Sequence, residues 1–551
     1  MFARLARRLP LGLLALTLAC ANAPETSDDP RPTNARERAI ADAGSAKIDG
    51  LLAEQWRAAG IEPSPITSDA EFLRRVSLDL IGRVPTRPEV DEFLAERDAD
   101  KREQLVDRLL ASSAFAEHWA RQWTDLLLPG DAKAEKLARD PLERYLVSAL
   151  SEGRSWDRVV HELLAGEGEL AQHPELAYLA ARGRGGDKAE RLAELTSTSA
   201  RVFLGSRIEC AQCHDHPYEP TISREDFWST VAWFGRLQID LERKVKPPKV
   251  AISERTRGDL RVALAEPGMD DLEADPRKRA IAPSFLGEPP TGVHADSRRA
   301  QLAAWIVDDP RFAAATVGLT WTKLFGRGIV EPWDDLLGQD PRSYPALLTT
   351  LAEQFRAHDH DPRVLIRTIV LSQAYQRSSR PAGETDDETR RRAAEAAFAR
   401  ASVRPLSAEQ LFDSLMITTG LDNVEDRAFA RAVQQRERQA LREYDFVFGD
   451  DEMAGGDAFT GNVPQALLLL NGALTNQAVV AREGSTLAEI LALRDREARI
   501  EALWRSAYAR DPTLDERAWA HGVLGPEGED RAALEDLFFA MLQSNEFTSN
   551  H

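Results

Sequence analysis

Residues 72–86 read FLRRVSLDLIGRVPT, and this stretch indicates the class of fold. Five of its apolar residues recur at the spacing that places side chains on one face of a helix, namely Phe72, Leu73, Val76, Leu80 and Ile81. The same spacing appears in residues 48–56 and 101–128, so the pattern predicts a mainly α-helical protein. Arg75 and Asp79 lie four residues apart, which favours a structural ion pair between them.

The stretch ends with a signal for the start of another helix. Pro85 and Thr86 are followed by Glu89, three residues after the threonine, which is the pattern of a capping box. In such a box the threonine side chain and the glutamate carboxylate each accept a hydrogen bond from the other residue's backbone N–H. We therefore expect a helix that begins after Thr86 and buries Val90 and Phe93.

Proline and glycine divide the chain into two helical regions. Helical periodicity lapses after residue 240, where Pro247-Pro248 and Pro289-Pro290 interrupt the sequence. Short strands fit this segment, for example over residues 249–252. We predict two multi-helical domains, over residues 46–240 and 299–551, joined by an irregular Pro/Gly-rich segment over residues 241–298.

Composition and charge narrow the class of protein. The chain has 551 residues, with 70 Lys and Arg against 90 Asp and Glu, and its formal net charge is −20 at pH 7. So acidic a surface repels nucleic-acid phosphates, and we expect no nucleic-acid partner. With 43% hydrophobic and 29% charged residues, the composition is that of a globular protein rather than a disordered one.

The first twenty residues, MFARLARRLPLGLLALTLAC, have the features of an export signal. Three arginines precede an apolar run that is too short to span a bilayer. The run ends at Cys20, in a context similar to the lipobox where bacterial lipoproteins are cleaved and lipidated. We predict a lipoprotein-type signal peptide over residues 1–20, lipidation of Cys20 and a flexible tether over residues 21–45. An ordinary secretory signal, with Cys20 merely near the cleavage site, is the alternative.

The sharpest chemical signal is Cys210-Ala-Gln-Cys213-His214. Cys-x-x-Cys-His is the sequence to which c-type haem is covalently attached. Two thiols one helical turn apart can add to the two vinyl groups of one porphyrin, and the adjoining imidazole is then placed to bind the iron. We therefore predict that Cys210 and Cys213 form the thioethers and that His214 is the proximal iron ligand.

Two haem-free structures fit the same residues. In an oxidising compartment Cys210 and Cys213 could form a disulfide, with His214 as a plain loop residue. Alternatively, the two thiolates and an imidazole could bind Zn²⁺ together with a distant fourth ligand. The sequence has no second Cys-x-x-Cys pair to complete a usual structural zinc site, and it leaves the three alternatives open.

The residues after the motif bear on the haem alternative. An aromatic-rich helix from Phe227 to Phe234 follows it and could line a porphyrin pocket, although aromatic residues at helical spacing more often belong to a core. His216 lies too close to His214 in sequence to bind the opposite face of the same haem. We therefore expect His216 in a polar pocket or linked to Asp215.

Signatures of common hydrolases and nucleotide-binding enzymes are absent from the sequence. It contains no Gly-x-Ser-x-Gly, no Walker loop and no His-Glu-x-x-His. The sequence therefore leaves open whether the protein is an enzyme.

Two short patterns recur along the chain. Two apolar residues, a serine and an aromatic residue recur with the same spacing in residues 109–115, 369–375 and 541–547. The segment from Arg83 to Glu89 likewise returns as residues 510–516, with the same Arg-x-Pro-Thr-x-x-Glu pattern. The unequal spacing argues against stacked repeats. Convergent helix capping is the favoured explanation, and duplicated helical hairpins are the alternative.

Several of these motifs together resemble a known family. Residues 72–86, 105–110, 119–123 and 210–217 are similar to the domain of unknown function named for cytochrome-like proteins of planctomycetes. A second group of motifs resembles its usual companion, another planctomycete-type domain of unknown function; it comprises residues 324–331, Asp334-Asp335 and residues 464–472. The resemblance covers about residues 45–551. Neither domain has an established activity, so the resemblance implies the domain arrangement and leaves the activity open.

These observations predict an exported, lipid-anchored, cytochrome-like protein of the cell envelope, either periplasmic or on the outer surface. It would bind one c-type haem for electron transfer or a redox step. A membrane would hold its lipid chain, and a redox partner protein would exchange electrons with it. The alternative is a haem-free binding or structural protein of the cell surface, with a disulfide or zinc at the same motif.

Overall fold

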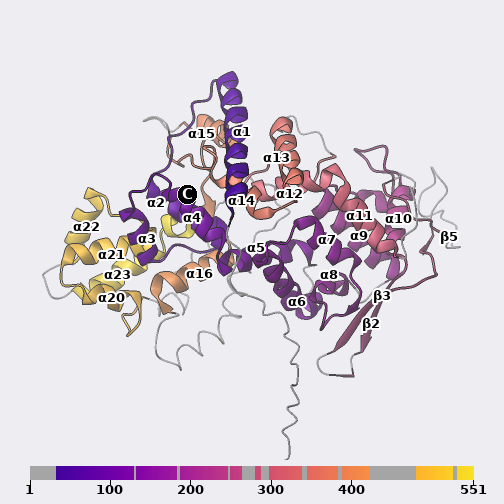
Figure 1. Cartoon of the computed structure of the whole chain (residues 1–551). Coiled ribbons are helices and arrows are strands. Elements are labelled where there is room, and N and C mark those ends of the chain that lie inside the picture. The colour runs from indigo at the N-terminus through magenta and orange to yellow at the C-terminus, as the bar shows by residue number, and fades with distance from the viewer. Residues whose placement is uncertain are drawn as a thin grey trace, which may run out of the picture.

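The computed structural model describes residues 33–128, 132–182, 187–242, 244–245, 248–263, 279–286, 297–337, 344–381, 387–421, 479–524 and 530–551. The predicted signal peptide, Cys20 and the motif at residues 464–472 lie outside these ranges. Within them helices predominate and strands are few and short, which confirms the mainly α-helical class (Figure 1). No helix in the described ranges is long and apolar enough to cross a bilayer.

The first helical region runs from α1 to α10, with three short 3₁₀ turns. Its α-helices are α1 (Ala35–Ala59), α2 (Asp69–Ile81), α3 (Arg87–Ala95), α4 (Lys101–Leu110), α5 (Ser113–Leu127), α6 (Ala132–Ser151), α7 (Trp156–Ala165), α8 (Ala177–Ala181), α9 (Lys188–Leu204) and α10 (Arg224–Val231). The 3₁₀ turns are η1 (Pro174–Leu176), η2 (Glu209–Gln212) and η3 (Ala232–Phe234).

Helix α1 begins inside the range predicted to be a tether. The Asn34 side chain accepts a hydrogen bond from the backbone N–H of Glu37 at 3.0 Å, and the Glu37 carboxylate accepts one from the N–H of Asn34 at 2.9 Å. This capping box starts the helix at Ala35, so the prediction of a tether through residue 45 is wrong from that point on. The segment is rich in polar residues without apolar periodicity, so the sequence did not indicate that a helix begins there.

Helices α2 and α3 meet as the sequence predicts. Gly82 ends α2 with a φ of 71°, a left-handed conformation that glycine adopts without strain. The capping box of Thr86 and Glu89 then starts α3 and confirms the second predicted helix. The predicted ion pair between Arg75 and Asp79 is wrong, because each of these side chains has another partner, described below.

Short antiparallel strands lie in and around the connecting segment and near the C-terminus. β1 (Gly168–Glu169), β3 (Lys249–Glu254) and β2 (Leu237–Glu242) form one sheet in the order β1-β3-β2, with Ile239 opposite Ile252. This confirms the strand predicted over residues 249–252. β4 (Arg261–Val262) pairs with β5 (Arg279–Ala280), and β6 (Arg404–Pro405) pairs with β7 (Ser549–Asn550) near the C-terminus.

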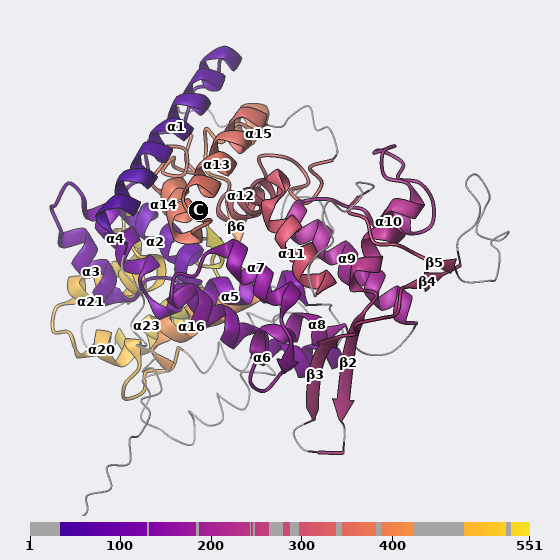
Figure 2. The same ribbon diagram turned by 45° about the vertical axis from the view of Figure 1, so that its right-hand side comes forward.

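The second helical region packs closely on the first. Its described helices are α11 (Arg298–Asp308), α12 (Pro310–Phe325), α13 (Pro345–Ala357), α14 (Pro362–Val370), α15 (Glu388–Ala396), α16 (Ala408–Thr419), α20 (Thr486–Ala492), α21 (Arg496–Tyr508), α22 (Leu514–Leu524), α23 (Asp530–Leu542) and α24 (Asn545–Thr548). Helix α1 lies along α14, α7 packs on α11 and α9 packs on α12 (Figures 1 and 2). One continuous hydrophobic core therefore includes residues of both regions.

The recurring serine pattern has the same structure in all three places. Each serine hydroxyl donates to the carbonyl oxygen three residues earlier, at 2.6–2.7 Å, and accepts from the backbone N–H three residues later, at 3.2–3.3 Å. The serines are Ser112, Ser372 and Ser544. Each serine therefore follows the end of a helix; Ser112 and Ser544 also cap the next helix, α5 and α24, whereas Ser372 is followed by turns.

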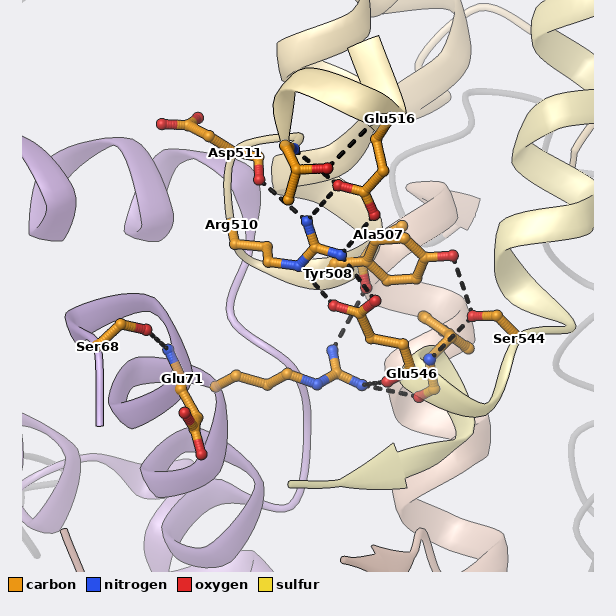
Figure 3. A network of polar contacts seen from close by, with 12 residues as sticks. Ser68, Glu71, Ala507, Tyr508, Arg510, Asp511, Glu516, Ser544 and Glu546 are labelled. Carbon is orange, nitrogen blue, oxygen red and sulfur yellow. Dashed lines mark hydrogen bonds and ion pairs between the residues drawn. The ribbon is translucent and has the colours of Figure 1, made fainter. Parts of the chain in front are cut away.

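The recurring arginine pattern is also reproduced in three dimensions. Arg83 donates two hydrogen bonds to the carboxylate of Glu89, and Arg510 does the same with Glu516. Figure 3 shows Arg510 between Glu516 and a second carboxylate, Glu546. Each arginine follows a residue with positive φ, and each pattern is followed by two helices and a capping serine. The matching order favours a duplicated helical unit over isolated capping, so the explanation favoured from sequence alone is revised.

Candidate functional site

The Cys-x-x-Cys-His motif lies on a short turn at the surface. Cys210 is within η2 and Cys213 directly follows it, between α9 and α10. Both side chains are exposed, and both thiols are free rather than joined in a disulfide. The structure therefore presents two accessible thiols in one turn of chain.

His214 is exposed beside the thiols and has one ring nitrogen engaged. Its Nδ1 lies 2.8 Å from the carbonyl oxygen of Asp215, and since a carbonyl only accepts, Nδ1–H is the donor. The lone pair of this tautomer is on Nε2. A backbone hydrogen bond at one nitrogen is the usual way in which a protein orients a histidine that binds metal through the other.

His216 is buried and organises the loop after the motif. Its Nε2–H donates to the carbonyl oxygen of Arg207 at 2.8 Å, and its Nδ1 accepts from the backbone N–H of Glu219 at 2.9 Å and of Tyr218 at 3.3 Å. Of the two environments expected for His216, the polar pocket is the one observed, and no link to Asp215 forms. The Asp215 carboxylate instead accepts a hydrogen bond from the N–H of Arg224 in the first turn of α10. Its negative charge there stabilises the N-terminus of the helix.

A buried ion pair joins the loop to the second helical region. Asp334 is 2% exposed, and its carboxylate lies 2.7 Å from the guanidinium of Arg207 and 3.5 Å from that of Arg201. The carbonyl oxygen of Arg207 is the acceptor for His216. A polar chain from Asp334 through Arg207 to His216 therefore positions the loop that carries the motif.

The aromatic residues after the motif belong to the core. Phe227, Trp228, Trp233 and Phe234 are buried, so they do not form an open wall for a porphyrin. Trp228 has a second role, because its indole N–H donates to the carbonyl oxygen of Gln212 at 3.1 Å. It thereby fixes the turn between the two cysteines.

The motif supplies the residue types that attachment of a c-type haem requires. Haem attachment requires two reactive thiols and one imidazole nitrogen, and Cys210, Cys213 and His214 supply these from the surface of one turn. Structural zinc requires four converging ligands. Among the side chains of the described ranges, no group of three or more His, Cys, Asp or Glu residues is arranged to hold a metal ion.

Phenylalanine in place of His216 should lower the free energy of unfolding of the haem-free protein by about 2–3 kcal/mol. The substitution leaves the Arg207 carbonyl and the two loop N–H groups without their partner, and each buried unsatisfied group costs about 1–3 kcal/mol, offset by relaxation and water. Urea unfolding measures the change. The same substitution at exposed His214 is the matched control and should stay within about 0.5 kcal/mol. A His216 variant as stable as that control would contradict this role.

Sequence reasoning identified the motif but missed the residues that hold it. Arg207 and Asp334 are 127 residues apart, and no spacing rule connects them. The Asp-Asp pair was visible only as part of a family motif. His216 could have been recognised from its position in a turn, where a histidine can accept from successive N–H groups.

The chain matches two family models, in the order that the motifs indicated. A model described as PSCyt2, a protein of unknown function (DUF1549), matches residues 47–238. A model described as PSD1, a protein of unknown function (DUF1553), matches residues 298–524. No curated protein and no solved structure matches the chain. The resemblance seen in the sequence is confirmed.

Proposed function

We propose that Cys210, Cys213 and His214 bind one c-type haem. The chain belongs to the proteins in which a PSCyt2 domain is followed by a PSD1 domain. The function would be electron transfer or a redox step. The observation that carries the proposal is the exposed turn, with two free thiols and an imidazole whose Nε2 is available.

The thiols would form the covalent attachment. Each cysteine would hold the haem through a thioether, its S–H added across the C=C bond of one vinyl group with the thiol hydrogen on the neighbouring carbon. The addition needs no external oxidant, provided that both sulfurs are reduced. The free, exposed state of Cys210 and Cys213 supports this step.

His214 would supply the axial nitrogen. Its Nδ1–H to the Asp215 carbonyl orients the ring and leaves the lone pair on Nε2. The bound haem would supply reversible one-electron chemistry at iron. The polar chain from Asp334 through Arg207 to His216 keeps the loop in place, and the hydrogen bond from Trp228 to Gln212 holds the turn between the two cysteines.

The cellular location is part of the same proposal and rests on the sequence. The N-terminal segment has the pattern of an export signal that ends at Cys20, and haem attachment to Cys-x-x-Cys-His takes place after export. We propose a lipid chain on Cys20 that anchors the protein to a membrane of the cell envelope. Mass spectrometry of the N-terminal peptide tests it, with Cys20→Ala as the unlipidated control.

Covalent haem is tested with the full chain expressed in a host that carries c-type haem maturation. A pyridine haemochrome spectrum should show a c-type band that survives denaturation, in a 1:1 ratio of haem to protein. Cys210→Ala/Cys213→Ala should abolish the band. His214→Ala should leave the cysteines in place but remove the proximal ligand.

Elemental analysis of the same samples separates the alternatives. Iron without zinc is the expected result. A colourless folded protein that contains one zinc ion would indicate that the motif binds zinc instead of haem. A colourless protein without metal and without titratable thiols would indicate a disulfide between Cys210 and Cys213.

A further inference from the structure

A second feature of the first domain is a small cavity between α8, α9 and β2. Its volume is about 210 Å³, and Figures 1 and 2 show α8 next to the ribbon of β2 and β3. Pockets for drug-sized ligands are roughly 300–1,000 Å³, so this cavity suits a smaller molecule.

The charged groups around the cavity are mostly of one sign. Four cationic side chains line it, namely Arg182, Lys188, Arg191 and Arg255. The lining has one carboxylate, Asp240, and both of its oxygens accept from the side-chain amide of Gln238 at 2.9 Å. In a chain with a net charge of −20, this local excess of positive charge requires an explanation.

Arg182 gives the strongest indication of a ligand. It is only 6% exposed, its two terminal nitrogens donate to the Leu127 carbonyl at 2.8 Å and to the Thr198 hydroxyl at 3.1 Å, and its Nε has no hydrogen-bond partner. Its bonded partners are neutral. Within the described ranges, no carboxylate lies at ion-pair distance from Arg182, Lys188 or Arg255.

Lys188 lies at the mouth of the cavity, in the first turn of α9. Its ammonium donates to the carbonyl oxygen of Gly235 at 2.8 Å. Burial lowers its pKa, and the charges of Arg255 and Arg191 lower it further. The N-terminus of α9 lies at the same place and is capped by the carboxylate of Asp187, which accepts from the N–H of Ala189 at 2.6 Å. An anion between these groups would neutralise charges that now repel one another.

The remaining wall is apolar. Four leucines line it, namely Leu179, Leu192, Leu195 and Leu237. They are buried side chains of the core, and inorganic anions gain nothing from contact with them. The lining therefore matches a molecule that has an anionic end and an apolar end.

We propose that this cavity binds a small organic anion, with its carboxylate or phosphate group between Arg182 and Lys188 and a short apolar body against the leucines. The site is separate from the Cys-x-x-Cys-His motif. The cavity lies at the N-terminal end of α9, whereas the motif follows its C-terminal end, and 17 helical residues span about 25 Å.

Isothermal titration calorimetry of the full chain tests the proposal. Hexanoate and butyl phosphate are the probes for the two anionic groups, hexanol is the neutral analogue, and inorganic phosphate has the charge without the apolar body. At least one amphipathic anion should bind, at least tenfold more tightly than hexanol and inorganic phosphate. The tighter of hexanoate and butyl phosphate identifies the anionic group. Added salt should weaken the binding.

Lys188→Met provides the matched variant, because this exposed lysine is not needed for the core. It should weaken binding by about tenfold or more, the factor expected for one hydrogen bond between charged groups. Lys47→Met, which changes an exposed residue of α1 outside this cavity, should bind as the unchanged protein does. Equal affinities of hexanoate and hexanol, equal losses in both variants, or no binding of any anion would each overturn the proposal. If inorganic phosphate bound more tightly than both organic anions, the proposal that the ligand has an apolar body would be overturned.

Discussion

Asparagine in place of Asp79 should lower the free energy of unfolding by about 3 kcal/mol or more. Asp79 is buried in α2 and joins segments that are far apart in the chain. One carboxylate oxygen accepts from Arg404 at 2.9 Å and from Asn550 at 2.8 Å. The other accepts from the hydroxyl of Tyr375 at 2.6 Å and from Arg404 at 3.1 Å.

The size of the loss follows from what remains after the substitution. Arg404 keeps its charge but loses the one carboxylate that pairs with it among the described residues, and removal of one member of a buried pair costs about 3–5 kcal/mol. The asparagine also places an NH₂ group where at least one donor already points. Strand β6, which contains Arg404, pairs with β7, which contains Asn550, so the loss should loosen the C-terminal strand as well.

Urea unfolding of the full chain, followed by circular dichroism, measures the effect. Asp98→Asn, on an exposed turn, is the matched control and should change stability by no more than about 0.5 kcal/mol. Arg404→Gln combined with Asp79→Asn should recover part of the loss, because the double variant has no unpaired buried charge. A single Asp79 variant within 1 kcal/mol of the unchanged protein would contradict the role assigned to this carboxylate.

The contacts of Asp79 also show where prediction from the sequence ends. The periodicity of residues 72–81 predicted α2 correctly, and the spacing of Arg75 and Asp79 suggested a local ion pair. In the structure Arg75 pairs with Glu71 at 2.7 Å, one turn in the other direction, and also donates to the carbonyl oxygens of Tyr375 and Arg377. Helical spacing identifies the residues that could form an ion pair within a helix, but it does not determine which pair forms when the whole helix is buried.

Neighbouring Arg74 extends this point. It is fully buried and donates to the carbonyl oxygens of Ala507, Glu546 and Phe547, more than 400 residues away in sequence. Figure 3 shows two of these residues, Ala507 and Glu546, beside Arg510 in the C-terminal unit. Local patterns predicted helices, caps and the Cys-x-x-Cys-His motif, because these depend on neighbouring residues. The docking of the two regions depends on side chains that meet only after folding.

Acid should destabilise the protein through His118, and glutamine at this position should reduce the effect. His118 is buried in α5, and its Nδ1 faces Gly82 so closely that a Cβ there would lie 2.4 Å away. Burial lowers the pKa of His118 to about 3, and the charges of Arg121 and Lys323 contribute to the shift. The unfolded chain has an ordinary histidine pKa of about 6.5.

The sign of the effect follows from which state binds the proton. Between pH 6.5 and about 3 the unfolded state is protonated at His118 and the folded state is not, so stability falls as the pH falls. The slope from this one group approaches about 1.4 kcal/mol per pH unit. Burial of the C-terminal His551 lowers its pKa to about 4 and acts in the same direction, whereas the raised pKa of Asp125, about 6, acts in the opposite direction.

The comparison with His118→Gln isolates the contribution of this residue, because the other groups titrate in both proteins. Urea unfolding at several pH values between 7 and 4.5 gives the difference in unfolding free energy at each pH. The unchanged protein should lose stability relative to the variant by about 2–3 kcal/mol over this range, with the loss beginning near pH 6.5. His161→Gln replaces a more accessible histidine on α7 and is the matched control for the substitution itself. If the difference in unfolding free energy between the unchanged protein and His118→Gln were the same at every pH, His118 would take up its proton equally well in the folded state. That outcome would contradict the prediction, because the close packing against Gly82 would then not oppose protonation.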